Sequence, residues 1–120
     1  MTYQHTILCV DDEPHNLDAL QRSLRKEYSV ITAASGPEAL EQLQSHSISL
    51  IITDQRMPHM TGVEFLEKSL EVCPEVIRII LTGFTDVEDL IGAINTGRVY
   101  RYITKPWDPH DLRLTVRRAL

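Results

Sequence analysis

Five short apolar runs, each long enough for one β-strand, alternate along the chain with segments of helical periodicity. The runs comprise residues 6–10, 29–33, 48–53, 76–81 and 99–103. The first, third and fourth runs are almost continuously apolar, which is typical of parallel strands that are covered on both faces. The second and fifth runs are less continuous, and we expect these two strands to be more exposed.

The segments between the runs carry apolar residues three and four positions apart. This spacing follows Pro14, the start signal at residues 35–37, Gly62, Asp86 and Pro109, so each segment predicts a helix. Strictly alternating strands and helices predict right-handed crossovers onto a parallel sheet. Five such units predict an α/β, flavodoxin-like (βα)5 doubly wound sandwich, in which a five-stranded parallel sheet has helices on both faces.

The length and composition favour one ordinary globular domain. The 120 residues suffice for one core but not for two. The last helical segment reaches Leu120 without a stop signal, so we expect residues 1–120 to be the N-terminal domain of a longer protein.

Two further features of the composition exclude classes of partner. No apolar run approaches the roughly 20 residues that cross a bilayer, and residues 1–6 do not resemble a secretory signal. We therefore expect a cytoplasmic protein without a membrane segment. The net charge of -5 argues against direct binding of nucleic acid by this domain.

Polar side chains follow or end the predicted strands. Asp11 and Asp12 follow the first strand, Asp54 the third and Thr82 the fourth, and Lys105 lies just beyond the fifth. Because the carboxyl ends of parallel strands meet at one edge of such a sheet, we expect these five residues to converge. A lone Asp at a strand–helix junction often only caps a helix. The prediction therefore depends on the complete set.

These residue types together suit phosphoryl transfer. Three carboxylates at one edge repel each other unless a cation neutralises them, and a few all-oxygen ligands suit Mg²⁺. The Thr82 hydroxyl and the Lys105 ammonium can each bind one oxygen of a phosphoryl group. A carboxylate can be the nucleophile in such a transfer. Since Asp54 is the most central of the three acids, we predict that it is phosphorylated in a Mg²⁺-dependent reaction.

Four segments of the chain carry a resemblance to a known family. They are residues 10–14 (VDDEP), 53–62 (TDQRMPHMTG), 81–83 (LTG) and 104–106 (TKP). Together they resemble the signature of the receiver domain of bacterial two-component response regulators, and the resemblance covers the whole chain. The set is specific because it fixes both the residue types and their order around the fold.

The resemblance implies a role for each site residue. Asp54 would be the phospho-acceptor, and a histidine kinase or a phosphotransfer protein would be the donor. Asp12, Asp54 and the main-chain carbonyl of Arg56 would ligate Mg²⁺, with Asp11 acting mainly through water. The Lys105–Pro106 bond resembles the cis peptide of the family, which would aim the lysine inward. The domain would phosphorylate and dephosphorylate itself but would not otherwise be an enzyme.

The resemblance also implies a switch. Phosphorylation adds about -1.5 to -2 charges, which would draw the Thr82 hydroxyl toward Asp54. Tyr102 matches the aromatic residue that rotates inward in such receivers, although it could also be a simple aromatic residue of an edge strand. The affected face would be formed by the fourth helix, the fifth strand and the fifth helix. Its charges of both signs predict either a two-fold homodimer or a solvated surface.

Two bulky residues occupy positions that vary in the family and tune the lifetime of the phosphorylated state. Arg56 lies two residues after Asp54, and Phe84 lies two residues after Thr82. We hypothesise that both overhang Asp54 and obstruct the hydrolytic water. The alternative is that both are exposed loop side chains.

The segment 97–108 resembles a narrower group of receivers. It is similar to receivers of hydrogenase-type transcriptional activators and of HD-domain cyclic-dinucleotide phosphodiesterases. This resemblance implies an output domain in cis, with transcription favoured over cyclic-dinucleotide turnover. Within the segment, we expect Trp107 to pack against the fifth helix.

Three alternative functions fit the residues less well. A haloacid-dehalogenase-like phosphohydrolase would place its nucleophile in a D-x-D after the first strand, whereas Asp11 and Asp12 are adjacent. A flavin-binding module would need a loop rich in Ser, Thr and Gly at that position. A scaffold receiver that is not phosphorylated would not need the complete set of five site residues.

Overall fold

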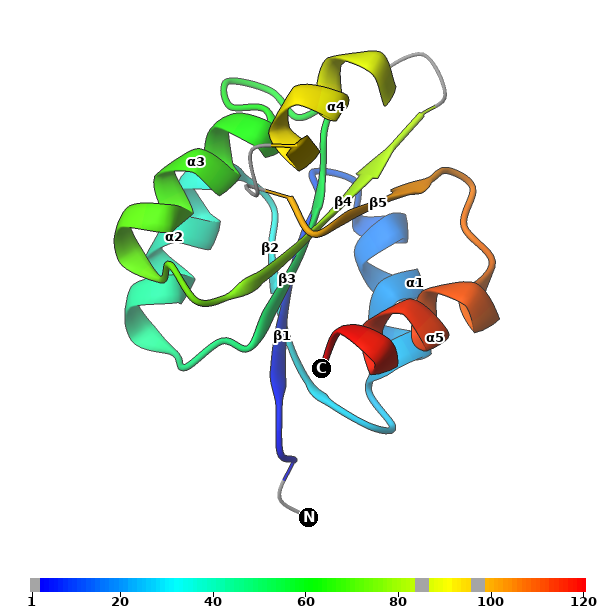
Figure 1. The fold of residues 1–120 in the computed structure, drawn as a ribbon. Helices are drawn as coiled ribbons and strands as arrows, with labels where there is room; N and C mark the ends of the chain where they lie inside the picture. Colours follow the sequence, from blue (N-terminus) through cyan, green and yellow to red (C-terminus); the bar gives the residue numbers. More distant parts are fainter. Residues whose placement is uncertain (1–2, 84–86, 96–98) are drawn as a thin grey trace.

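A computed structural model of the protein describes residues 3–83, 87–95 and 99–120, and within them strands and helices alternate (Figure 1). The strands are β1 (Thr6–Val10), β2 (Ser29–Ala33), β3 (Leu50–Asp54), β4 (Ile77–Thr82) and β5 (Arg101–Thr104). The helices are α1 (Pro14–Leu24), α2 (Gly36–Ser45), α3 (Gly62–Val72), α4 (Val87–Asn95) and α5 (Pro109–Ala119). No described helix has the length and apolar character needed to cross a membrane.

All five strands pair in parallel in the order β2-β1-β3-β4-β5. The chain therefore winds first to one side of β1 and then to the other, and the order reverses between β1 and β3. Helices α1 and α5 cover one face of the sheet, and α2, α3 and α4 cover the other (Figure 1). This arrangement is the flavodoxin-like doubly wound sandwich that the sequence predicts.

The two cores follow the alternation of side chains along β1. Leu8 and Val10 belong to the core beneath α2, α3 and α4. Ile7 and Cys9 belong to the core beneath α1 and α5. Burial raises the pKa of the Cys9 thiol to about 12, so this cysteine is a packing residue and not a reactive one.

The predicted boundaries of three strands are wrong by one or two residues. The third, fourth and fifth apolar runs include Ile48, Val76 and Val99, which are buried but lie before the strands begin. Hydrophobicity marks burial, and these three residues enter the core from connecting segments. At the other end, Asp54 and Thr82 are the last residues of β3 and β4. The prediction that the second and fifth strands are more exposed is confirmed, because β2 and β5 form the edges of the sheet.

Arg78 is a buried charged residue within the apolar run of β4. Its side chain is only 4% exposed, and the guanidinium donates to Ser69 Oγ at 2.9 Å and to the carbonyls of Cys73, Pro74 and Val76. These carbonyls follow the end of α3, where a positive charge is favourable. Burial lowers the pKa of Arg78. The residue therefore fixes the end of α3 to the start of β4.

Replacing Arg78 with methionine should lower the free energy of unfolding by about 2–4 kcal/mol, because the buried Val76 carbonyl, the part-buried Cys73 and Pro74 carbonyls and the Ser69 hydroxyl would lose their donor. Chemical denaturation measures this change. The matched control is Arg118→Met, at an exposed position of α5, which should change stability by no more than about 0.5 kcal/mol. Equal stability of the two variants would contradict a structural role for Arg78.

Candidate functional site

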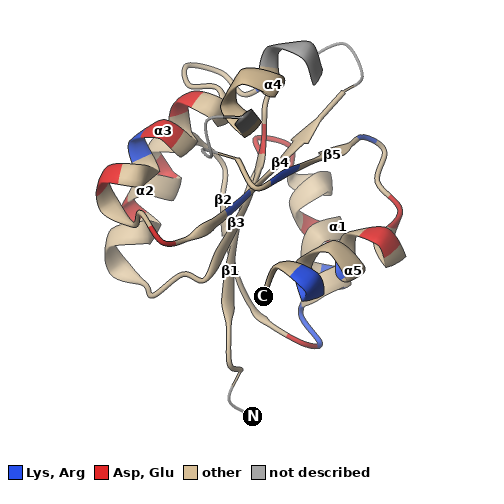
Figure 2. Cartoon of the chain, in the orientation of Figure 1, with Lys and Arg blue, Asp and Glu red and all other residues tan. Residues whose placement is uncertain are grey.

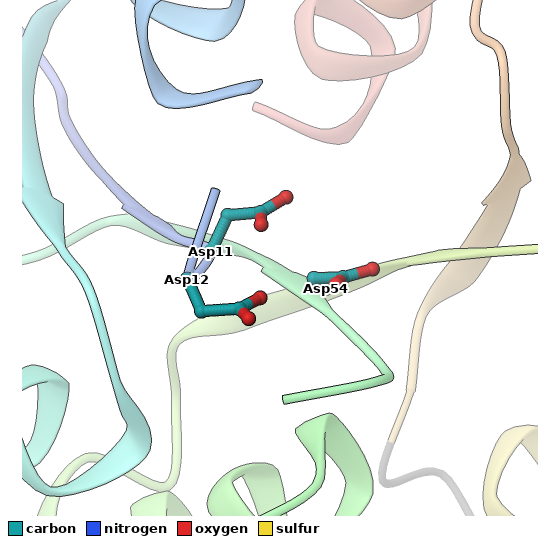
Figure 3. A group of neighbouring side chains, drawn as sticks. All are labelled: Asp11, Asp12 and Asp54. Atoms are coloured by element: carbon teal, nitrogen blue, oxygen red, sulfur yellow. The ribbon is translucent and has the colours of Figure 1, made fainter. Parts of the chain in front are cut away.

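Three carboxylates gather where β1 and β3 end. One carboxylate oxygen from each of Asp11, Asp12 and Asp54 lies within 4.8 Å of the other two, and the side chains project into the same space (Figure 3). Asp11 follows β1 and is fully buried, whereas Asp54 ends β3 and is 4% exposed. Parallel pairing of β1 with β3 brings these residues together, as expected at the switch point of a doubly wound sheet.

Burial makes this concentration of negative charge costly. Desolvation raises the pKa of Asp11, and the Asp54 charge raises it further; hydrogen bonds from the Glu13 N–H and from Asn16 oppose this shift. Desolvation also raises the pKa of Asp54, while the hydrogen bond and positive charge of Lys105 oppose the shift. Three hard oxygen donors around one space fit Mg²⁺. A divalent cation would also neutralise charge that one lysine cannot.

Lys105 enters the acidic cluster from the end of β5. Its Nζ lies 2.6 Å from Asp54 Oδ1 and 3.9 Å from Asp11 Oδ2. The Lys105 N–H donates to the Thr82 carbonyl at 2.8 Å, which ties the end of β5 to that of β4. The Lys105–Pro106 peptide bond is cis, as the resemblance implies. The structure thus brings together four of the five residues selected at the strand ends.

Thr82 and Tyr102 lie on neighbouring strands but in different environments. Thr82 is 1% exposed, and its hydroxyl donates to the Gly83 carbonyl at 3.2 Å. Tyr102 pairs with Ile80 across β4 and β5 and is 36% exposed. In this state the Thr82 hydroxyl is engaged by the main chain, and the Tyr102 ring is open to solvent.

The loop after Asp54 is held by Gln55. Its N–H donates to the Leu81 carbonyl at 3.0 Å, and its carbonyl accepts from the Gly62 N–H at 2.9 Å. Its side-chain Oε1 accepts from the Val63 N–H at 2.9 Å, which satisfies one of the free donors in the first turn of α3. Gln55 therefore connects β3, β4 and α3 immediately beside Asp54.

Of the two residues proposed to tune the lifetime of the phosphorylated state, the structure describes Arg56 but not Phe84. The Arg56 side chain is exposed in the loop between β3 and α3. Phe84 lies outside the described residues. The hypothesis that these side chains overhang Asp54 stays a prediction.

Sequence reasoning missed two residues that position the site. Asn16 Nδ2 donates to Asp11 Oδ2 at 3.1 Å, and Gln55 holds the loop beside Asp54. The sequence gives a weak indication of the role of Asn16. This residue lies in the first turn of the predicted helix, about one helical turn beyond Asp11 and Asp12, where its side chain can reach them. Gln55 carries none, since its partner Val63 is eight residues away and is brought close only by the fold.

Gly62 is required by a close approach between α3 and the acceptor strand. A Cβ atom at this position would lie 2.3 Å from the Asp54 carbonyl oxygen and 3.0 Å from Gln55 Cα. Gly62→Ala should therefore lower the free energy of unfolding by about 1–3 kcal/mol and displace Asp54. Thermal or chemical denaturation measures this loss.

Gly92 of α4 provides the matched control. A Cβ there would meet no atom of the described residues within 4 Å, and alanine is favoured over glycine in a helix by about 1 kcal/mol. Gly92→Ala should leave the protein as stable or more stable. A Gly62→Ala variant as stable as the Gly92→Ala variant would refute the steric argument.

The family is decided by comparison with known proteins. The model of the response regulator receiver domain matches residues 7–117. The chain belongs to this family. It is 48% identical to the hydrogenase transcriptional regulatory protein HoxA of Cupriavidus necator, over 98% of this chain and 24% of that protein. It is 41% identical to HoxA of Bradyrhizobium diazoefficiens, over 100% of this chain and 25% of that protein.

A solved receiver structure agrees with the fold. The signal receiver domain of an HD domain-containing protein from Pseudomonas fluorescens has a TM-score of 0.90 and is 36% identical, with 100% of this chain and 89% of that chain covered. The receiver chain spans about a quarter of the length of the curated relatives it matches.

The family match gives the site a general context. Receiver domains are phospho-acceptor switches rather than classical enzymes, and they typically bind Mg²⁺. The acidic cluster of this receiver could hold such an ion. The match favours a receiver over both the flavin-binding module and the haloacid-dehalogenase-like hydrolase.

Proposed function

We propose that this receiver accepts a phosphoryl group on Asp54 from a histidine kinase or a phosphotransfer protein and thereby controls an attached output domain. The observation that carries the proposal is the buried carboxylate of Asp54 beside two further acids, with Lys105 Nζ only 2.6 Å away. The Asp54 carboxylate is largely shielded from solvent, and the Lys105 ammonium beside it can neutralise part of the charge of a transferred phosphoryl group.

In the proposed transfer, an oxygen of the Asp54 carboxylate forms a bond to phosphorus. The bond from phosphorus to the donor nitrogen breaks, and its electron pair stays on that nitrogen. Before transfer, the Lys105 ammonium neutralises the Asp54 carboxylate. After transfer, it stabilises the negative charge of the phosphoryl oxygens. In self-dephosphorylation, water attacks the same phosphorus and the bond from phosphorus to the Asp54 oxygen breaks. Inorganic phosphate leaves, and the Asp54 carboxylate is restored.

Asp11, Asp12, Asp54 and the Arg56 carbonyl would hold the Mg²⁺ ion, with Asp11 acting mainly through water. When bound, the ion neutralises charge on the phosphoryl oxygens. The fit rests on the donor chemistry, because three carboxylate oxygens within 4.8 Å of one another are hard ligands.

We further propose that Thr82 and Tyr102 report the modification. The Thr82 hydroxyl would exchange the Gly83 carbonyl for a phosphoryl oxygen, which is the stronger acceptor. Tyr102 would then rotate inward from its exposed position on β5. These movements would alter the face formed by α4, β5 and α5, through which phosphorylated copies would form a homodimer.

For the whole protein, we propose a cytoplasmic regulator in which residues 1–120 form the N-terminal receiver and the output domain controls transcription. The similarity to two hydrogenase transcriptional regulators about four times as long supports this organisation. The similarity to the receiver of an HD domain-containing protein supports cyclic-dinucleotide turnover as the second candidate function of the output domain.

Incubation with Mg²⁺ and acetyl phosphate should add the mass of one phosphoryl group to the protein, as measured by intact-protein mass spectrometry. Asp54→Asn should abolish the addition because it removes the nucleophile, and chelation of Mg²⁺ should slow it strongly. Asp18→Asn, at an exposed position of α1, is the control and should be modified like the natural protein. Equal modification of Asp54→Asn would show that the acceptor is another residue.

Arg56→Asn and Phe84→Ala should each accelerate loss of the phosphoryl group several-fold if these side chains obstruct water. The rate is measured after the phosphodonor is removed, in the presence of Mg²⁺. The exposed Arg25→Asn variant controls for the loss of one positive charge. Unchanged rates in both test variants would rule out the obstruction hypothesis.

A further inference from the structure

A groove of about 660 Å³ lies between α1 and the segment that leads from β5 into α5. Its wall includes Asn16 and Arg22 from α1, Lys105, Pro106 and Trp107 from the connecting segment, and Arg113 from α5. The volume is within the range of small-molecule sites in proteins. None of Asp11, Asp12 and Asp54 lines the groove.

The groove is positively charged in an acidic protein. Three of its lining residues are cations and none is an acid, whereas the whole chain has a net charge of -5. Basic segments occur on both α1 and α5 in Figure 2. Within the described part of the chain, Arg22 and Arg113 have no carboxylate partner, in contrast to Arg117, whose Nη2 lies 3.1 Å from Glu27 Oε1. Two guanidinium groups are therefore available to an anion.

One part of the groove wall is apolar. Trp107 packs against the core beneath α1 and α5, as the sequence predicts, and also lines the groove together with the rings of Pro106 and Pro109. These rings favour a flat aromatic ligand, because a ligand ring that stacks on them also buries its apolar face against them.

We propose that this groove binds a small aromatic anion, in which a flat ring lies against Trp107 and Pro106 and a carboxylate, sulfonate or phosphate group binds Arg22 and Arg113. The positive charges of the groove favour an anionic ligand, and the proline and tryptophan rings favour a ligand with a flat ring.

Two residues of the groove wall contact the acidic cluster. Asn16 donates to Asp11 Oδ2 at 3.1 Å, and Lys105 Nζ lies 2.6 Å from Asp54 Oδ1. An anion in the groove would compete with Asp54 for the positive charge of Lys105. This coupling, which rests on the proposed function, should slow phosphorylation of Asp54, whereas binding itself does not depend on it.

Trp107 is the only tryptophan of the chain, so its fluorescence reports on the groove. The probe is 1-anilinonaphthalene-8-sulfonate, and N-phenyl-1-naphthylamine is its uncharged analogue with the same rings. The sulfonate should quench Trp107 saturably and bind at least about tenfold more tightly than the analogue. The Arg22→Gln/Arg113→Gln variant should lose about tenfold in affinity, while the control Arg25→Gln/Arg118→Gln should not.

Competition with AMP and with adenosine distinguishes the sources of the anion. Displacement of the probe by AMP but not by adenosine assigns a nucleotide; displacement by benzoate but not by AMP assigns an aromatic acid. If the two double variants bound the sulfonate probe with equal affinity, or if the natural protein bound the probe and its uncharged analogue equally, the proposal would be wrong. The dye would then bind non-specifically. Loss of phosphotransfer from a kinase in Arg22→Gln/Arg113→Gln, without any effect on dye affinity, would instead assign the groove to a protein partner.

The coupling is tested with acetyl phosphate as donor, so that no kinase is needed. Saturating probe should slow phosphorylation several-fold in the natural protein and in the control variant. Binding without slowing would overturn the coupling alone. Absence of phosphorylation even without probe would overturn the proposed function and leave the binding result intact.

Discussion

Parallel pairing of β3 with β1 on one side and β4 on the other holds Asp54 at the carboxyl edge of the sheet. The same pairing places Asp11 beside it and, through β4 and β5, brings Lys105 into contact with it. None of these residues is a sequence neighbour of Asp54. The geometry of the candidate site therefore depends on the hydrogen-bonded register of a fully buried strand. A slip by one residue would exchange the side chains that β3 packs into the two cores and would move Asp54 away from Asp11.

The acidic cluster is balanced only in part by the protein itself. Asp11 and Asp54 are both desolvated, which raises the pKa of each, and Lys105 supplies a single positive charge. This incomplete neutralisation favours binding of a cation at the cluster, and a phosphoryl group added as proposed would change the balance of charge again. Hydrogen bonds from Gln55 and the close contact of Gly62 keep the surrounding loop in place.

Lys105 and Asn16 connect two environments of opposite charge. On one side each contacts a buried carboxylate, and on the other each lines the groove between α1 and α5. Arg113 and Arg117 of α5 are directed to the side of α1, where Arg113 lines the groove and Arg117 pairs with Glu27. Sequence spacing along α5 does not reveal this, because the orientation of the helix depends on how Leu112 and Val116 pack.

The sequence by itself determined the alternation of strands and helices, the family signature and the choice of Asp11, Asp12, Asp54, Thr82 and Lys105, because apolar periodicity and residue chemistry are local properties. Only the tertiary structure decided where the strands begin, since Ile48, Val76 and Val99 are buried without being in strands. It also decided the roles of Asn16, Gln55 and Arg78 and formed the groove beside Trp107. These features depend on contacts between segments that are distant in the sequence or on the rotation of a helix about its axis, and the packing of the two cores fixes both.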